Sequence, residues 1–359
     1  DGRPGNWKKQ DLTAGQRLLI NKDDIVVLEE MEEFDSASPE VLADFIAWGV
    51  ANFPARRYAL ILDDHGGGYT GIGSDWTNHS WMSLPAIAQG LADGLEAAQL
   101  EQFDFLFFYA CLMGNWEVAH AMEPHTRYLL ASEELAIGAS FRLDRFQLAH
   151  DDGEVPAETL AWAIAEEYVP TWSKAYTDVT ISLLDLARLP DFELALGAFL
   201  DTLSKDPPGY VGDLMAARHM SEQFASLPFG FYSMQLLDLG GLLTHFVDRR
   251  PELATAAEAT FAAYDELVVN NDVGPGHAQA TGMSVFFPPS SEYYNETNPY
   301  NGSSPGLEYE NAGPPQIWRD FLVSLLENVT IADMGPMFGC FAGDEREICA
   351  DQSDWLVET

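Results

Sequence analysis

The chain has 359 residues, of which 57 are acidic and 18 basic, and its formal net charge at pH 7 is −39. A field of this sign repels phosphate backbones and anionic lipids, so nucleic acids and membrane surfaces are poor partners. Hydrophobic residues make up 47% of the chain and charged residues 21%. This composition is typical of a folded protein, and no apolar run reaches the ~18–20 residues that a membrane helix needs.

The first part of the chain alternates between helical and buried-strand patterns. Continuous apolar runs such as "FDFLFFYA" predict strands of a parallel sheet that is buried on both faces, and amphipathic stretches predict the helices between them. Ser38 is a candidate N-cap for the first helix, and Pro54 follows its end. The expected strands are 57–64, 103–110 and 127–132, and the expected helices are 38–52, 84–100 and 115–124. This order is typical of an α/β protein.

The pattern changes after about Leu148, but the alternation continues. The expected helices are 156–172, 192–203 and 253–269, the expected strands are 178–186, 232–239 and 282–288, and the expected loop is 288–306. No internal repeat or low-complexity linker separates two domains. We therefore expect one sheet-centred domain over residues 1–330, with helical insertions in its second half (about 151–330), and a small acidic tail over 331–359.

Three cysteines occur, at positions 111, 340 and 349. Cys340 and Cys349 flank the short stretch "FAGDEREI", which one disulfide could close; two free thiols are the alternative. That disulfide would leave Cys111 as the free thiol. The first residues, "DGRPGNW", read like a loop inside a protein, so we expect a trimmed or cut N-terminus.

Two strand ends carry residues that are suited to chemistry. The strand "YALILDD" is followed by His65 and a run of glycines, and "FDFLFFYA" is followed by Cys111. In an open α/β sheet, ligands bind at the carboxyl ends of the strands, so both side chains fall on the expected edge. A thiol needs an adjacent base to become a thiolate, and histidine is the usual one. The backbone N–H groups of Gly66 and of Cys111, which we expect to head the next helix, could stabilise an oxyanion.

The same residues have other interpretations. A cysteine after an apolar strand is often a core residue, and His65 could be a turn residue or, with Asp63 and Asp64, a metal ligand. The string "HGGG" also matches the oxyanion loop of lipases, but the chain has no G-x-S-x-G elbow. It has neither H-E-x-x-H nor C-x-x-C, so zinc chemistry lacks support.

Several motifs together resemble one family. "YALILDDHGGG", "FFYACLMGNWEVAHAM" and "RYLLASEE", with the later "ISLLDL" and "TGMSVFFP", resemble the clostripain-like cysteine peptidases of the caspase–legumain–gingipain clan. The resemblance spans about residues 39–288. It implies a caspase-like α/β/α sandwich with a mostly parallel central sheet, whose catalytic half covers about 39–150. It also implies that this chain is an exported or cell-surface bacterial endopeptidase, with His65 and Cys111 as its catalytic dyad.

The resemblance also suggests where a substrate would bind. Tyr109 and Ala110 precede the nucleophile, and Ser132, Glu133 and Glu134 end the neighbouring strand, so we expect these five residues near the S1 pocket. The family has an Asp where this chain has Tyr109, and that Asp selects Arg or Lys at P1, the residue before the scissile bond. A buried guanidinium without its carboxylate loses about 3 kcal/mol or more. Strict specificity for Arg or Lys is therefore not expected.

The distribution of basic residues agrees with the absence of strict specificity for Arg or Lys. Members of the family are often activated by self-cleavage after a basic residue between the catalytic His and Cys, and no Lys or Arg occurs between Arg57 and Arg127. We expect a chain that stays uncut between His65 and Cys111. Family members usually have one or two further strands before the point where this chain begins, which also fits an incomplete N-terminus.

The alternative function is a catalytically silent binding or surface-interaction protein on the same fold. Tyr109 favours this alternative, and the presence of both His65 and Cys111 favours the enzyme. We expect peptide or protein substrates, a monomer, no membrane insertion and no cofactor. Some relatives need Ca²⁺, and Asp63, Asp64 and Asp75 are candidate ligands, but abundance of carboxylates is not coordination geometry. The acidity is attributed to solubility, with attraction of cationic substrates as the alternative.

Overall fold

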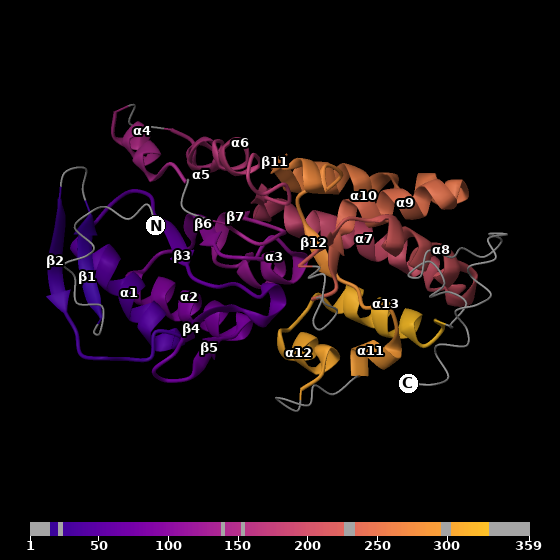
Figure 1. The fold of residues 1–359 in the computed structure, drawn as a ribbon, viewed down its shortest axis with the longest axis horizontal. Coiled ribbons are helices and arrows are strands. Elements are labelled where there is room, and N and C mark those ends of the chain that lie inside the picture. Colours follow the sequence, from indigo (N-terminus) through magenta and orange to yellow (C-terminus); the bar gives the residue numbers. More distant parts are fainter. Residues whose placement is uncertain are drawn as a thin grey trace.

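The computed structural model describes residues 15–20, 24–137, 141–151, 155–225, 234–295 and 303–329 (Figure 1). Its strands are β1 (Gln16–Ile20), β2 (Ile25–Glu30), β3 (Ala59–Asp63), β4 (Ile72–Asp75), β5 (Ser80–Met82), β6 (Phe103–Tyr109), β7 (Thr126–Ala131), β8 (Thr180–Asp185), β9 (Gln223–Phe224), β10 (Leu236–Asp238), β11 (Val268–Val273) and β12 (Ser284–Phe286). Its α-helices are α1 (Pro39–Asn52), α2 (Leu84–Ala98), α3 (Trp116–Met122), α4 (Phe146–Asp151), α5 (Ala157–Ala165), α6 (Tyr168–Trp172), α7 (Leu189–Leu203), α8 (Pro207–Met220), α9 (Leu239–Arg249), α10 (Ala254–Leu267), α11 (Ser291–Asn295), α12 (Pro305–Asn311) and α13 (Gln316–Leu326). The expected tail and its cysteine pair lie outside the described residues.

The central sheet has five strands in the order β11-β8-β7-β6-β3. β3, β6 and β7 are parallel neighbours, and Asp63 pairs with Tyr109 where β3 and β6 both end. β8 runs antiparallel to its neighbours β7 and β11. The α/β fold predicted from the strand–helix alternation is confirmed. Only β3, β6 and β7 are parallel to one another, so the sheet as a whole is mixed.

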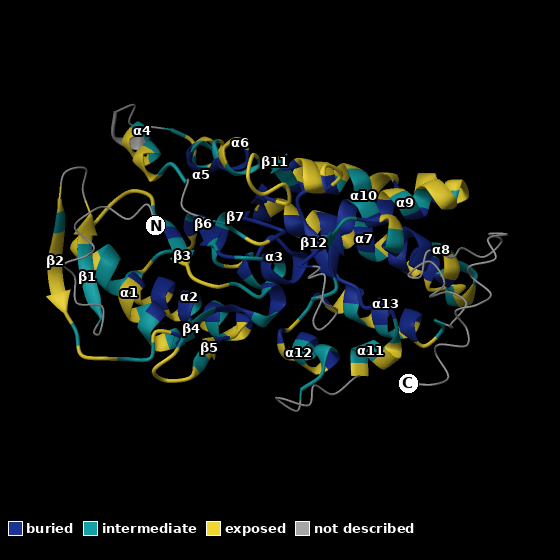
Figure 2. Cartoon of the chain, viewed as in Figure 1, coloured by how far each residue is buried: buried dark blue, intermediate teal, exposed yellow. Residues whose placement is uncertain are grey.

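Side chains of β6 alternate between two hydrophobic cores, one on each face of the sheet. Leu106 and Phe108 pack with α1 and α2, whereas Phe105 and Phe107 pack with α5 and α6. All four side chains are at most 1% exposed. Figure 2 shows this buried centre between the outer helices. Because helices cover both faces, residues 105–108 of the strand are all apolar, and the charged Asp104 lies near its start, where it accepts the Tyr58 N–H.

The second half of the chain adds an antiparallel sheet in the order β12-β10-β9. β10 and β12 lie within the stretches 232–239 and 282–288 that were expected to be strands, although both strands are shorter. A bridge between Asn115 and Ser284 joins β12 to the segment that leads into α3. The second sheet is therefore attached directly to the chain that follows β6.

Several elements were not expected from the sequence. The hairpins β1–β2 and β4–β5, strands β9 and β11, and helices α4, α8, α9, α11, α12 and α13 belong to this group. α8 begins with two prolines and contains Gly209 and Gly212, which hides its helical pattern. The helix expected over 253–269 is α10, which ends at Leu267; β11 begins at the next residue, Val268. The expected loop 288–306 contains α11.

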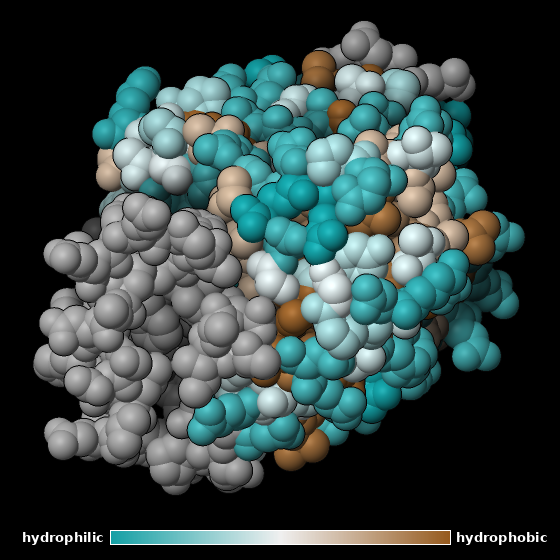
Figure 3. Space-filling model, turned by 90° about the vertical axis from the view of Figure 1, so that its right-hand side faces the viewer, coloured by the Kyte–Doolittle hydropathy of each residue, from teal (hydrophilic) through white to brown (hydrophobic). Residues whose placement is uncertain are grey.

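The described surface is polar in most places, but the β1–β2 hairpin exposes Leu19, Ile20, Val26, Val27 and Leu28. On the face shown in Figure 3 the described residues are mostly hydrophilic, with separate hydrophobic residues among them. Within the described part of the chain, no helix has the length and apolar character that crossing a membrane requires.

Candidate active site

Cys111 lies in a turn directly after β6. Ala110 before it is 2% exposed, Leu112 after it is 4% exposed, and Cys111 itself is partly exposed. Leu112 has a left-handed backbone with φ = 65°, which costs a non-glycine residue about 1–2 kcal/mol. The Leu112 N–H donates to the Glu134 carbonyl at 3.2 Å, and the Gly114 N–H donates to the Ser132 carbonyl at 2.7 Å. The chain after β7 therefore holds the turn in this strained shape.

The expectation that Cys111 heads the next helix is wrong. α3 begins at Trp116, and Asn115 is its N-cap, whose side chain accepts from the Val118 N–H. Strained turn residues separate Cys111 from the helix. The dipole of α3 therefore does not act on Cys111 from the first helical position, because such effects fade within the first turn of a helix.

The glycines after His65 pack against the Cys111 turn. A Cβ on Gly66 would lie 2.2 Å from the Cys111 carbonyl oxygen and 2.9 Å from its nitrogen, closer than any real contact. Gly68 has φ = 58°, and a Cβ there would lie 2.7 Å from the Asn115 side chain. Only glycine permits this approach of two backbones. The exposed His65 therefore adjoins a residue in direct contact with Cys111.

Gly66 also lies in a short antiparallel bridge with Ile72. The bridge is formed by hydrogen bonds from the Gly67 N–H to the Gly71 carbonyl and from the Gly73 N–H to the His65 carbonyl, each 2.9 Å long. The Gly66 N–H takes no part in the bridge. Its role as an oxyanion donor, like that of the Cys111 N–H, stays a prediction.

The Cys111 thiol contacts the backbone of Ala136, a contact that was not predicted from the sequence. The Ala136 N–H donates to Cys111 Sγ at 3.3 Å, and the thiol faces the Ala136 carbonyl at 3.9 Å. The next residue, Ile137, donates its N–H to the Tyr168 hydroxyl at 2.8 Å. Burial raises the pKa of Tyr168 to about 12, and the nearby Cys111 acts in the same direction. No sequence pattern marks Ala136, because its contact is made through the backbone.

Tyr109 belongs to an aromatic cluster on the face covered by α5 and α6. Its ring stacks on Phe107 with centroids 5.8 Å apart and meets the edge of Phe141 at 4.5 Å. Phe141 stacks in turn on Tyr168 at 4.6 Å. Burial and the neighbouring Asp63 raise the pKa of Tyr109 above its usual range. The position two residues before Cys111 is thus aromatic and half-buried, with one carboxyl group on the adjacent strand.

The structure places Ser132 and Glu133 inside the protein. Ser132 Oγ lies 3.0 Å from Thr180 Oγ1, which also accepts the Glu133 N–H at 3.0 Å. Glu133 is fully buried, and its Oε2 accepts the Gly282 N–H at 3.1 Å. Both side chains therefore have partners in the interior, which leaves them poorly placed to contact a substrate.

Glu133 forms a buried pair with Asp238. Its Oε1 receives no N–H or O–H from the described residues, and the Asp238 carboxyl is close enough to raise the pKa of Glu133, so a proton shared by the two carboxyl groups fits the pair. Asp238 accepts from the Thr281 N–H at 2.6 Å and the Gly241 N–H at 2.5 Å, as the N-cap of α9. Burial and the charge of Asp238 raise the pKa of Glu133 well above its ordinary value. Glu133 therefore holds the proton.

Glu134 is also buried, with 7% of its surface exposed. Its carboxylate accepts the N–H groups of Leu135 and Ala225 and faces His277 Nε2 at 3.1 Å. His277 is a residue of this region that sequence reasoning missed. The histidines looked scattered along the chain, and His277 lies 143 positions from Glu134.

The described residues contain no cluster of three or more His, Cys, Asp or Glu side chains that could hold a metal ion. Asp75 accepts the N–H groups of Asn78, Ser36 and Thr77, which hold its pKa below the usual range. The Asp64 carboxylate accepts the His65 N–H at 2.5 Å. Dependence on Ca²⁺ stays untested.

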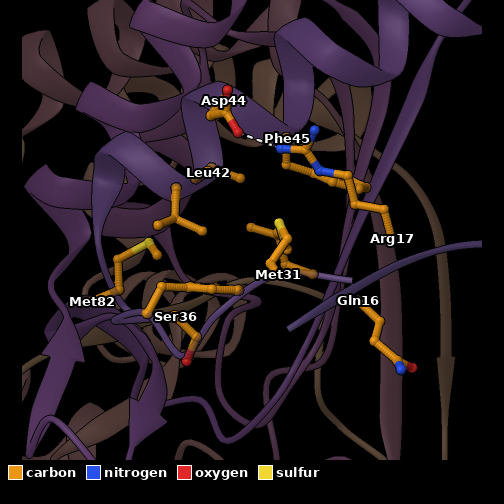
Figure 4. Close-up of a pocket in the computed structure, with 11 residues that line it drawn as sticks. Gln16, Arg17, Met31, Ser36, Leu42, Asp44, Phe45 and Met82 are labelled. Carbon is orange, nitrogen blue, oxygen red and sulfur yellow. Dashed lines mark hydrogen bonds and ion pairs between the residues drawn. The ribbon is translucent and has the colours of Figure 1, made fainter. Parts of the chain in front are cut away.

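A cavity of about 430 Å³ lies elsewhere, between the β1–β2 hairpin and α1 (Figure 4). Leu42 and Met31 contribute to its apolar lining, and Arg17 forms an ion pair with Asp44 at its rim. None of the expected site residues lines it. The cavity is thus separate from the Cys111 turn.

The chain is similar in sequence to known proteins of one family. The model of the clostripain family (Peptidase_C11) matches residues 17–301. Clostripain of Hathewaya histolytica is 32% identical over 127 residues, which are 32% of this chain and 24% of that protein. The match therefore spans about a quarter of that relative's length.

Solved structures share the fold at low identity. A secreted C11 cysteine protease from Bacteroides thetaiotaomicron, in complex with an irreversible peptide inhibitor, has a TM-score of 0.54 and 19% identity, covering 83% of this chain and 84% of that one. An inactive zymogen C11 protease from Parabacteroides distasonis has a TM-score of 0.56 and 21% identity, covering 86% and 83%. These similarities support the fold.

Substitution of Gly66 by alanine tests the contact with the Cys111 turn. The added Cβ would collide with backbone, so Gly66→Ala should lower the free energy of unfolding by about 1–3 kcal/mol. The measurement is urea unfolding. Gly49→Ala in α1 is the control, because no atom lies within 4 Å of its Cβ position. It should instead raise stability by about 0.5–1 kcal/mol. Equal effects of the two substitutions would contradict the contact.

The buried proton of Glu133 makes a pH-dependent prediction. The folded protein keeps a proton that the unfolded chain releases above about pH 4.5, so the wild type loses stability as the pH rises toward the raised pKa. Glu133→Gln has the same shape and no proton to lose. Its stability relative to wild type should therefore increase steadily as the pH rises above about 4.5, measured by urea unfolding at each pH. Glu101→Gln, at an exposed position, should show no such trend; a flat difference for Glu133→Gln would exclude the shared proton.

Proposed function

Because the chain belongs to the clostripain family, we propose that it is a cysteine endopeptidase that cleaves peptides or proteins with Cys111 and His65. The observation that carries the proposal is the contact between the Gly66 position and the Cys111 backbone. It brings together the turns that follow β3 and β6, at the carboxyl edge of the parallel strands, where ligands bind in open α/β sheets. The exposure of His65 and the partial exposure of Cys111 leave both side chains accessible.

The chemistry follows from the two side chains. The Cys111 thiolate attacks the scissile carbonyl carbon and forms a thioester, and His65 gives a proton to the departing amine. Water then attacks the thioester while His65 accepts one of its protons; the carbon–sulfur bond breaks, the carboxylic acid product leaves, and the Cys111 thiolate and protonated His65 are restored. The N–H groups of Gly66 and Cys111 donate to the oxyanion of each tetrahedral intermediate.

Tyr109 sets the expected substrate preference. It stands two residues before the nucleophile, and its ring packs in the aromatic cluster with Phe107 and Phe141. A guanidinium or ammonium group placed there would be partly desolvated without the carboxylate that the family has at this position. The proposed S1 pocket therefore does not demand Arg or Lys. Ala110 is 2% exposed, so we expect it to contribute to this pocket through its backbone alone.

The proposed setting is an exported or cell-surface bacterial protein that acts as a monomer without a cofactor. One similar structure is described as that of a secreted protease, which supports export. The net charge of −39 repels nucleic acids and anionic lipids. Peptides and proteins therefore remain the best candidates for substrates.

The dyad is tested by substitution and by alkylation. Cys111→Ala and His65→Ala should each lower kcat for peptide hydrolysis by about 10³-fold or more, because nucleophile and base act as a unit. Iodoacetamide at about pH 6 should label wild-type Cys111, whereas an ordinary thiol is largely protonated there, and His65→Ala should abolish the labelling.

Mass spectrometry of peptides assigns the label, since Cys340 and Cys349 are also present. His245→Ala, on α9, is the control histidine substitution and should change neither readout. An inert Cys111 together with an inactive wild type would instead favour the silent binding protein.

The substrate preference is tested with fluorogenic peptides that differ only at P1. We expect kcat/KM for Arg and Lys to be no higher than for apolar residues, because Tyr109 replaces the carboxylate of the pocket. A clear preference for Arg would refute this. The variant Asp63→Asn would then show whether the carboxyl group on β3, paired with Tyr109 in register, supplies the missing charge.

A further inference from the structure

The carboxylate of Glu134 is held from several sides. Its Oε1 accepts the Leu135 N–H at 2.8 Å, its Oε2 accepts the Ala225 N–H at 3.0 Å, and His277 Nε2 lies 3.1 Å from Oε2. Glu134 and His277 are each 7% exposed. A buried carboxylate with this many donors is fixed in orientation, and so is the backbone that carries it.

The backbone of the same segment contacts the nucleophile and its strained neighbour. The Glu134 carbonyl accepts the Leu112 N–H at 3.2 Å, and Leu112 is the residue with φ = 65°. Two residues beyond Glu134, the Ala136 N–H donates to Cys111 Sγ at 3.3 Å. Any shift of residues 134–136 would therefore change both the position of the sulfur and the shape of its turn.

His277 connects this segment to the second half of the chain. Its Nδ1 faces Glu222 Oε2 at 3.2 Å, and its ring lies 4.9 Å from that of Phe224. Burial opposes the charged form, but the hydrogen bonds to Glu134 and Glu222 outweigh it and raise the pKa of His277. With a carboxylate on each side, the imidazole donates through both nitrogens. Glu222 is fixed in turn by the Gln279 N–H at 3.3 Å.

We infer that His277 is a positioning residue of the active site: it holds Glu134, and through Glu134 the segment that contacts Cys111 and Leu112. The inference deepens the proposed function and rests on it for its kinetic consequence. The hydrogen-bond contacts of Cys111 Sγ are made with Ala136, and His277 itself is 7% exposed. Its effect on the reaction is therefore an effect on the placement of Cys111.

The test compares His277→Ala and His277→Gln in the full chain with wild type. The alanine variant should lower kcat by about 10- to 100-fold, because a misplaced nucleophile loses alignment with the carbonyl. KM should remain close to wild type, since no substrate contact is lost. The glutamine variant should recover part of the loss, because its amide can still donate to Glu134.

His120→Ala is the matched control. His120 is also a part-buried histidine paired with a carboxylate, with Nδ1 2.7 Å from Glu193 Oε1 on α7. Glu193 accepts from Trp116 Nε1 at 2.9 Å, whereas Glu134 accepts from the backbone beside the Cys111 turn. This variant should keep the kcat of the wild type. Equal losses in the two alanine variants, or a kcat near wild type in His277→Ala, would overturn the inference.

Alkylation of Cys111 by iodoacetamide separates this inference from the proposed function. If the wild type cleaves no peptide, the proposed function fails, and a changed alkylation rate of Cys111 in His277→Ala but not in His120→Ala still supports the positioning role. If the wild type is active and His277→Ala changes neither kcat nor alkylation, only the inference fails. If His277→Ala does not fold, Glu222→Gln tests the role instead, because Glu222 holds the other side of the imidazole. We expect it to lower kcat by less than His277→Ala would. An unchanged kcat in Glu222→Gln would contradict the positioning role.

Discussion

The close approach of the Gly66 and Cys111 backbones is the contact on which the site depends. A Cβ at position 66 would lie 2.2 Å from the Cys111 carbonyl oxygen, so the two turns can meet only because a glycine stands there. The parallel register of β3 and β6 brings the turns to the same edge, since Asp63 pairs with Tyr109 at the last step of both strands. The arrangement of the two turns thus requires both the parallel pairing of β3 with β6 and a glycine at position 66.

The end of β7 holds the Cys111 turn from the other side, and it does so with polar groups buried in the interior. Thr180 Oγ1 accepts the N–H groups of both Glu133 and Glu134, and the Glu134 carbonyl accepts the Leu112 N–H. Buried carboxyl groups are costly unless each finds donors or a proton. Glu133 meets this condition with a proton shared with Asp238, and Glu134 with backbone N–H groups and His277. The strain at Leu112 is therefore maintained by a network that reaches the second half of the chain.

The edge that carries Cys111 combines a fold shared with C11 proteases and a local departure at Tyr109. Solved C11 proteases with 19% and 21% identity share the fold with this chain. At that identity the fold alone is shared, and the chemistry of each pocket depends on its own residues. Here the residue two positions before Cys111 belongs to an aromatic cluster of Phe107, Tyr109 and Phe141, packed under α5 and α6. An aromatic cluster presents a different surface from a carboxylate, so family membership does not by itself define the chemistry at this position.

The sequence alone determined the strands that precede His65 and Cys111, because both are continuous apolar runs and glycines mark the turn after the first. Only β6 is buried on both faces; β3 is an edge strand and is mostly half-buried, which its apolar sequence did not reveal. The sequence also indicated the family, through motifs that are local in the chain. The tertiary structure decided what the charged residues near the site do. Glu133 and Glu134 follow a strand like Cys111, and only packing shows that they point inward, toward Asp238 and toward His277, 143 positions away from Glu134. It likewise showed that Cys111 precedes its helix by a strained turn. Such contacts join residues distant in the chain or backbone atoms common to every residue, so no side-chain pattern records them.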